Sequence, residues 1–256
     1  MRPTPYAHVN AVLDELLAGM RGVLGEKLVG LYLFGSLVTG SYDDGISDID
    51  LLAATAAAVD DEELEALRRM HAELVARRPE WNDRIEVAYP STAALQTFKT
   101  QTSRLAIISP GEPLHTVAAG RDWLLNWYPV LEADVALFGP PPRDLIAPIS
   151  KEEYVAEVRA HVRAWGRGWG SLRDRGSQSY AVLTMCRALH THRTGEYVSK
   201  ARAAAWAQRA FPEWADLIRE AIQVRTAPRE ERAQPSPTIA EAARFVHVIK
   251  REIAGT

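Results

Sequence analysis

Apolar positions in the first half of the chain change spacing from one segment to the next. Residues 6–24 carry them every three or four positions, which predicts a helix. Residues 28–34 form a nearly continuous apolar run, as in a buried strand. Further strands are predicted at 46–54 and 84–89, with a helix at 60–78 between them. Alternating strands and helices predict a mixed α/β domain.

The second half shows helical spacing throughout. Helices are predicted at 151–165, 180–193, 199–210, 212–224 and 238–253. An earlier helix is predicted at 122–138, where Pro129 should kink or split it. A small bundle is the expected architecture. Three prolines, Pro140-Pro141-Pro142, precede it, and proline cannot continue a helix or a strand ladder. We therefore expect an α/β domain at residues 1–148 and an all-α domain at 149–256.

Composition adds mainly exclusions. The 256 residues are 47% hydrophobic and 25% charged, as in an ordinary globular protein with a sizeable core. The net charge of −3 weighs against broad nucleic-acid binding, which needs a basic surplus. A single cysteine, Cys186, excludes an internal disulfide and fits a cytoplasmic location. No apolar run is long enough for a signal peptide or a membrane span. His190 and His192 stand two apart on a predicted helix, and we expect them at the surface or at the rim of a cleft.

Candidate chemistry begins where the first predicted strand ends, at Gly35-Ser36. About a dozen residues later, Asp48 and Asp50 open the next strand, and alternation places both carboxylates on one face. Gly35 has no Cβ to keep a phosphate away from the backbone, and Ser36 offers a hydroxyl and an amide. Paired carboxylates and phosphate oxygens are ligands that Mg²⁺ prefers. This pattern predicts a site for magnesium and a triphosphate.

A third carboxylate, Glu86, lies on the next predicted strand. If that strand pairs beside the second, Glu86 reaches the same site as a metal ligand, a general base for an acceptor hydroxyl, or both. A Gly-Ser pair alone is common in turns, and Asp-x-Asp alone is common at solvated strand edges. The ordered combination of the strand, Gly-Ser, Asp-x-Asp and Glu is far rarer and indicates a nucleotidyltransferase active site.

With these residues the sequence resembles the polymerase-β-type nucleotidyltransferase superfamily. More narrowly, it is similar to the aminoglycoside adenylyltransferases of the 3''/9 type, which modify streptomycin and spectinomycin. The closer match is carried by 180–187 (YAVLTMCR), 194–196 (TGE), 199–200 (SK), 203–207 (AAAWA) and 245–247 (FVH). The resemblance covers about residues 25–90 and 178–253. It implies transfer of AMP from ATP to a drug hydroxyl, with pyrophosphate leaving.

The resemblance also implies roles for individual residues. Ser36 would touch the triphosphate, Asp48 and Asp50 would hold Mg²⁺, and Glu86 would be the base. Arg187 and Lys200 would bind ATP phosphates. The residues themselves support this last pair. Arg187 lies within a predicted apolar helix, where an unpaired charge is costly, and Lys200 lies at a predicted helix start, where the helix dipole disfavours a cation.

The acceptor is the least defined part of the pattern. Residues 91–134 depart from the family, and Trp123 is a candidate for its acceptor-facing tryptophan. Trp169 and Asp174 resemble a pair used for streptomycin, and Tyr180 occupies a drug-binding place. We expect a monomer that binds ATP and a small cationic acceptor such as an aminoglycoside, with neither nucleic acid nor membrane as partner. The alternatives are a nucleotidyltransferase acting on a protein or RNA, and a non-catalytic nucleotide-binding module.

Overall fold

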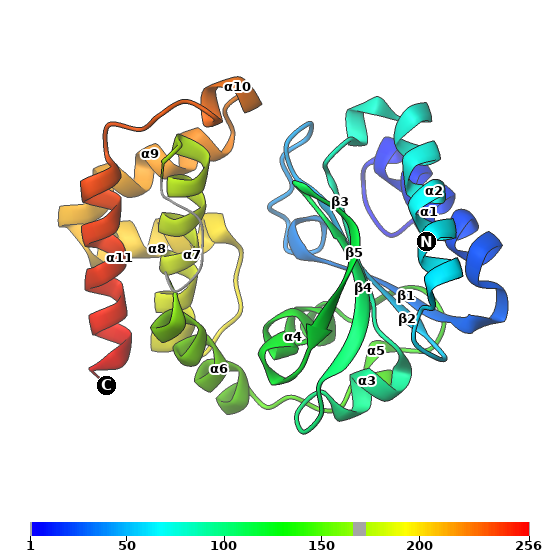
Figure 1. Cartoon of the computed structure of the whole chain (residues 1–256). Coiled ribbons are helices and arrows are strands. Elements are labelled where there is room, and N and C mark those ends of the chain that lie inside the picture. Colours follow the sequence, from blue (N-terminus) through cyan, green and yellow to red (C-terminus); the bar gives the residue numbers. More distant parts are fainter. Residues whose placement is uncertain (1, 166–172, 256) are drawn as a thin grey trace. The chain divides into compact units, whose positions relative to one another are not determined.

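The computed structural model describes residues 2–165 and 173–255, and it divides into two compact units, Met1–Ile149 and Ser150–Thr256 (Figure 1). The first unit is built on a six-stranded sheet of order β5-β4-β3-β2-β1-β6. Its strands are β1 (Leu28–Phe34), β2 (Ile49–Thr55), β3 (Ile85–Tyr89), β4 (Ser103–Ser109), β5 (Glu112–Ala119) and β6 (Val135–Phe138). The β2–β3 pair is parallel and the other neighbours are antiparallel.

Helices α1 (Ala7–Leu24) and α2 (Asp61–Arg77) lie on one side of this sheet, and α4 (Leu124–Ala133) lies on the other (Figure 1). The apolar stripe of α1 packs in one buried cluster with alternate residues of the central strands, including Leu33, Leu51 and Val87. The intervening residues therefore point to the α4 side. Short helices α3 (Thr92–Thr97) and α5 (Pro142–Leu145) complete the unit.

Local signals in the sequence explain the clearest boundaries. Asp60 and Glu63 form a reciprocal capping box at the start of α2. Ser150 and Glu153 do the same for α6 (Lys151–Ala164), the first helix of the second unit. Such caps satisfy backbone amides that have no partner within the helix.

One prediction in this half was wrong. The segment 122–138, expected to be helical and kinked or split at Pro129, instead holds a 3₁₀ turn, η4 (Arg121–Trp123), then α4, which contains Pro129, then the edge strand β6. Asp134, at φ +48°, ends α4 in the left-handed region and releases the chain into β6. The triple proline continues no helix, and its last residue, Pro142, begins the short helix α5, because the first position of a helix needs no amide hydrogen.

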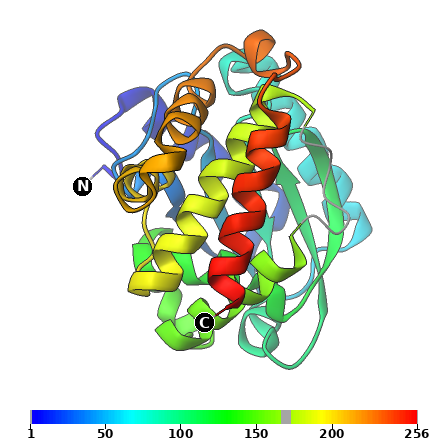
Figure 2. The same cartoon turned by 90° about the vertical axis from the view of Figure 1, so that its left-hand side faces the viewer.

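The second unit is helical, as its spacing predicts. Its helices after α6 are α7 (Arg175–Thr194), α8 (Lys200–Ala210), α9 (Ala215–Arg225), α10 (Arg229–Arg232) and α11 (Ile239–Ala254). Helix α7 is central and packs against α6, α8, α9 and α11, and Figure 2 shows α11 running alongside it. Gly195, at φ +70°, ends α7. No helix in the described part of the chain is long and apolar enough to cross a membrane.

Candidate active site

The end of β1 brings Gly35 against Asp50. Gly35 opens a 3₁₀ turn, η2 (Gly35–Leu37), with φ +72°, a conformation that other residues adopt only with strain. A Cβ atom at Gly35 would overlap the Asp50 carboxylate. Glycine is thus required twice here, for the backbone turn and for the space that the carboxylate occupies.

Strand register brings the second acid to the same place. Asp50 is the pairing partner of Phe34 on β1 and of Glu86 on β3. Directly paired residues on neighbouring strands share a face, and their backbones lie about 4.8 Å apart. Both acids therefore point away from the core face that holds Ile49 and Leu51. The strand pairing places Asp50 beside Glu86, and the Asp50 carboxylate lies against Gly35.

Asp48 is held differently from Asp50. Strand β2 begins at Ile49, so Asp48 precedes the ladder, and strand alternation alone does not set the direction of its side chain. Asp48, Asp50 and Glu86 each have polar interactions within the protein. Within residues 2–165 and 173–255, no three His, Cys, Asp or Glu side chains are arranged to hold a metal ion. The sequence predicted three converging acids, whereas strand pairing fixes only Asp50 and Glu86 together.

Ser36 carries an unsatisfied group at this corner. Its Oγ is shielded from solvent and has no hydrogen-bond partner among the described residues, while its carbonyl accepts from the Ser41 amide at 3.1 Å. A buried hydroxyl without a partner costs about 1–3 kcal/mol. A phosphate oxygen would satisfy it. This corner thus offers a hydroxyl, two carboxylates on paired strand residues, and a glycine that leaves the backbone accessible. These groups fit a magnesium ion bound with a triphosphate.

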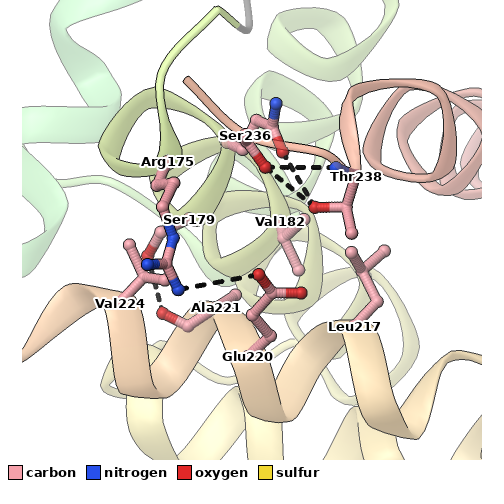
Figure 3. A pocket seen from close by; sticks show the side chains of 10 residues that line it. Arg175, Ser179, Val182, Leu217, Glu220, Ala221, Val224, Ser236 and Thr238 are labelled. Atoms are coloured by element: carbon pink, nitrogen blue, oxygen red, sulfur yellow. Dashed lines mark hydrogen bonds and ion pairs between the residues drawn. The ribbon is translucent and has the colours of Figure 1, made fainter. Parts of the chain in front are cut away.

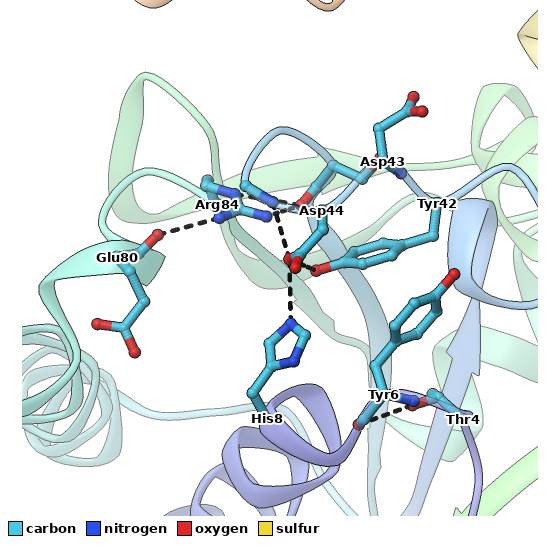
Figure 4. A network of polar contacts seen from close by, with 10 residues as sticks. Thr4, Tyr6, His8, Tyr42, Asp43, Asp44, Glu80 and Arg84 are labelled. Carbon is cyan, nitrogen blue, oxygen red and sulfur yellow. Dashed lines mark hydrogen bonds and ion pairs between the residues drawn. The ribbon is translucent and has the colours of Figure 1, made fainter.

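A polar network that the sequence reasoning missed anchors the loop leading to these acids (Figure 4). Asp44 accepts from the Tyr42 hydroxyl at 3.2 Å and lies 3.0 Å from His8 Nε2. Arg84, immediately before β3, donates to the Ser47 carbonyl from Nε at 3.2 Å and from Nη2 at 2.7 Å. The one signal in the sequence that could have indicated this network is Arg84, a charged residue two positions before Glu86.

In the second unit, the two predicted phosphate-binding cations lie against aromatic rings. Arg187, on α7, has its Cζ 5.8 Å from the centroid of the Tyr197 ring. Lys200 is the first residue of α8, and its Nζ lies 4.7 Å from the centroid of the Tyr180 ring. Attraction between a cation and a ring face offsets part of the cost of placing Lys200 at a helix start.

The predicted acceptor residues have separate surroundings. Trp123 ends η4 and packs on Trp127, with centroids 5.2 Å apart. Asp174 caps α7 and accepts from the Ser177 amide at 2.7 Å, so its position has a structural explanation. Tyr180 is 46% exposed and stacks on Trp165. Trp169 lies outside the described residues.

Two residues of α7 are less accessible than a reactive group would be. His190 is buried with its ring edge-to-face against Trp206, so the prediction of a surface histidine was wrong. Burial raises the pKa of the Cys186 thiol to about 12, which leaves it protonated and unreactive at neutral pH. Cys186 is a packing residue.

A polar hollow within the second unit is lined by side chains that bond to one another (Figure 3). Ser179 Oγ donates to the Ala221 carbonyl at 2.7 Å, and Thr238 Oγ1 donates to Gln178 Oε1 at 3.2 Å. Arg175 pairs with Glu220 and Glu231. These mutual contacts join α7 to α9 and to the segment before α11, so the hollow is a structural joint.

Each half of the chain matches a known protein domain. A model described as "Nucleotidyltransferase domain" matches residues 19–87, and one described as "Aminoglycoside adenylyltransferase, C-terminal domain" matches residues 144–252. Aminoglycoside (3'') (9) adenylyltransferases of Shigella flexneri and Escherichia coli are each 26% identical over 275 residues, covering 99% of this chain and 98% of the relative.

A solved structure shares the fold over nearly the whole length. It is a spectinomycin adenyltransferase from Enterococcus faecialis, crystallised with ATP and spectinomycin. Its TM-score is 0.72 at 17% sequence identity, covering 95% of this chain and 98% of that one. At this identity the likeness concerns the fold, which is an α/β nucleotidyltransferase domain with a helical second domain.

Proposed function

We propose that this chain transfers AMP from ATP to a hydroxyl of an aminoglycoside-type antibiotic and releases pyrophosphate, because its first half matches a nucleotidyltransferase domain, its second half matches the C-terminal domain of aminoglycoside adenylyltransferases, and its curated relatives are aminoglycoside adenylyltransferases. The observation that supports this most is the corner where Asp50 lies against Gly35 and pairs in register with Glu86. Binding of adenine alone would not require carboxylates so placed, whereas they suit phosphoryl chemistry.

Magnesium is the ion that this oxygen-rich corner fits. Asp48 and Asp50 are its proposed ligands, and Glu86, the pairing partner of Asp50 on β3, is proposed to add a third oxygen when the ion binds. Bound Mg²⁺ would neutralise negative charge on the phosphate oxygens. The unsatisfied Ser36 hydroxyl would donate to a phosphate oxygen of ATP, and the missing Cβ of Gly35 would leave the backbone open to it.

Glu86 is the proposed general base. In the reaction, the acceptor hydroxyl loses its proton to the Glu86 carboxylate while its oxygen attacks the α-phosphorus of ATP. The bond from the α-phosphorus to the bridging oxygen breaks, and pyrophosphate leaves in line with the attack. Arg187 and Lys200 are proposed to bind ATP phosphates, because guanidinium and ammonium groups donate charge-assisted hydrogen bonds to phosphate oxygens.

Pyrophosphate release in the presence of Mg²⁺ and ATP tests the proposal. We expect release with at least one of streptomycin, spectinomycin and kanamycin, and none without an acceptor. Asp48→Asn should abolish turnover, and Glu86→Ala should keep ATP binding but lose transfer. Asp61→Asn is the matched control, because that carboxylate is 84% exposed at the start of α2 and pairs only with Arg104 among the contacts described for it.

The outcomes separate the alternatives. Normal turnover by Asp48→Asn would contradict its metal role, and an unchanged kcat for Glu86→Ala would remove it as the base. Release only with a protein or RNA acceptor would reassign the substrate. ATP binding without release under any acceptor would leave a nucleotide-binding module. Circular dichroism of each variant checks that the fold is retained.

A further inference from the structure

We propose that Arg84 is a positioning residue that sets the direction of the Asp48 side chain by holding the peptide groups on both sides of it. This inference rests on the proposed function, because it assigns Arg84 a role in seating magnesium with ATP. It concerns a residue outside the acids, the glycine-serine turn and the phosphate-binding cations described above.

The first of these two peptide groups is held by the Arg84 side chain. Nε and Nη2 both donate to the carbonyl of Ser47, at 3.2 Å and 2.7 Å, and this carbonyl belongs to the peptide that enters Asp48. The second peptide group is held by the Arg84 backbone. The amide of Ile49, in the peptide that leaves Asp48, donates to the Arg84 carbonyl at 2.9 Å. One residue thus restrains both backbone torsions of Asp48.

The guanidinium itself is firmly placed. Its Nη1 donates to the Glu80 carbonyl at 3.1 Å. Its Cζ lies 4.5 Å from the centroid of the Trp81 ring, and Trp81 is only 1% exposed. The guanidinium is planar, all three of its nitrogens donate hydrogen bonds, and it stacks on a buried ring, so it can move little. The Ser47 carbonyl that it binds is therefore held in a fixed position.

This clamp is needed because Asp48 lies just outside the sheet. The β2–β3 ladder begins at the Ile49–Ile85 pair, and Arg84 extends the restraint by one residue beyond it. On the far side, buried Ser47 accepts from the Asp43 amide through Oγ at 2.9 Å. Catalytic groups must be held within about 0.5 Å of their productive position. Arg84 is also two residues from Glu86, so it couples both acid-bearing segments.

Lysine cannot replace this arrangement. Its single ammonium can keep the positive charge and one hydrogen bond, but it cannot donate two bonds to one carbonyl while stacking on Trp81. Arg84→Lys therefore keeps the positive charge at this position but removes the paired hydrogen bonds to the Ser47 carbonyl. Arg104→Ala is the matched control, because Arg104 is an exposed arginine of the same sheet whose Nη2 pairs with Asp61 at 2.7 Å.

The test measures metal binding as well as turnover. Mn²⁺, a spectroscopic substitute for Mg²⁺, is titrated into protein with ATP and followed by electron paramagnetic resonance, and the Mg²⁺ concentration for half-maximal pyrophosphate release is measured in parallel. We expect Arg84→Ala and Arg84→Lys each to weaken Mn²⁺ binding by about 10–100-fold, the range seen when support of a metal ligand is lost. Metal-free ATP binding should change less than threefold, and millimolar guanidinium should partly restore Arg84→Ala.

The results distinguish two failures. Folded Arg84→Lys with wild-type Mn²⁺ affinity and wild-type Mg²⁺ dependence would overturn the positioning role while leaving the proposed function intact. Wild-type protein that neither binds Mn²⁺ with ATP nor releases pyrophosphate would overturn both. An Arg104→Ala variant with the same loss as Arg84→Lys would also overturn the role, because the effect would then not be specific to the clamp.

Discussion

The sheet corner of the first unit and the α7–α8 surface of the second carry their chemical groups in different ways. At the corner, Phe34, Asp50 and Glu86 are successive partners across three strands, so backbone hydrogen bonds set their spacing. On the helices, Arg187 and Lys200 come from separate elements, and each lies against a tyrosine ring. Side-chain packing, rather than a shared ladder, places them.

Because their groups are held differently, the sheet corner and the α7–α8 surface should respond differently to mutation. A group fixed by strand register moves only if the backbone moves, so small steric changes beside it should have large effects. A cation resting on a ring already has a partner, so a bound phosphate must compete with that contact. We therefore expect sharp losses at the corner and graded losses on the helices.

The largest expected effect is that of Gly35→Ala. The new Cβ would displace the Asp50 carboxylate and strain a backbone at φ +72°. We expect kcat/KM to fall about 1,000-fold, which corresponds to about 4 kcal/mol of transition-state stabilisation. Gly40→Ala is the matched control, because Gly40 has φ +68° but open space around its Cβ position. It should lose about 1 kcal/mol of stability and keep its activity.

Lowering the pH should destabilise the first unit through a buried histidine of α2. His71 is 3% exposed, its Nε2 lies 2.6 Å from the Tyr89 hydroxyl, and burial lowers its pKa to about 4. The unfolded chain takes up a proton on His71 below about pH 6.5, whereas the folded chain does not until about pH 4. Stability present above pH 6.5 is therefore lost as the pH falls through this window, by about 3 kcal/mol.

Urea unfolding at a series of pH values measures this loss. His71→Gln keeps a group able to bond with the Tyr89 hydroxyl but removes the titration, so its stability should depend less on pH between 6.5 and 4. An equally steep decline in that variant would contradict the assignment to His71.

Lys200→Met should have a smaller effect on activity, and mainly on ATP binding. We expect the KM for ATP to rise about 10-fold with kcat changed less, because the ammonium is proposed to hold ATP phosphate in both ground and transition states. Arg202→Ala, which changes an exposed side chain two positions further along α8, is the control. A kcat loss matching that of Gly35→Ala would remove the distinction between corner and helix.

The smallest expected effects come from the two capping boxes. Asp60→Ala and Ser150→Ala each remove a cap at the start of α2 or α6 and should cost about 1 kcal/mol of unfolding free energy. Neither cap belongs to the proposed site, so kcat should stay within twofold of wild type. Thermal unfolding and steady-state kinetics measure the two quantities, and a large kcat change in either would show that the site depends on these helices.

Several elements were predictable because their signals are local. The strand at 28–34 was predicted with its observed bounds, and α2 was predicted to within one residue at each end, since apolar runs and caps act over a few positions. The β4–β5 hairpin was not predicted, and 122–138 was misread as helical throughout. The left-handed turn at Asp134 and the pairing of β6 with β1 decide that region, and neither follows from periodicity.

The amino-acid sequence by itself determined the class of each half, the glycine-serine turn and the acids that follow it, because residue type and spacing along one chain carry that information. Only the tertiary structure decided that Glu86 pairs with Asp50, that Asp48 stays outside the ladder, and that Arg84 holds the peptides around it. These depend on which strands lie side by side, and that choice is made by burial of the whole sheet rather than by any local segment.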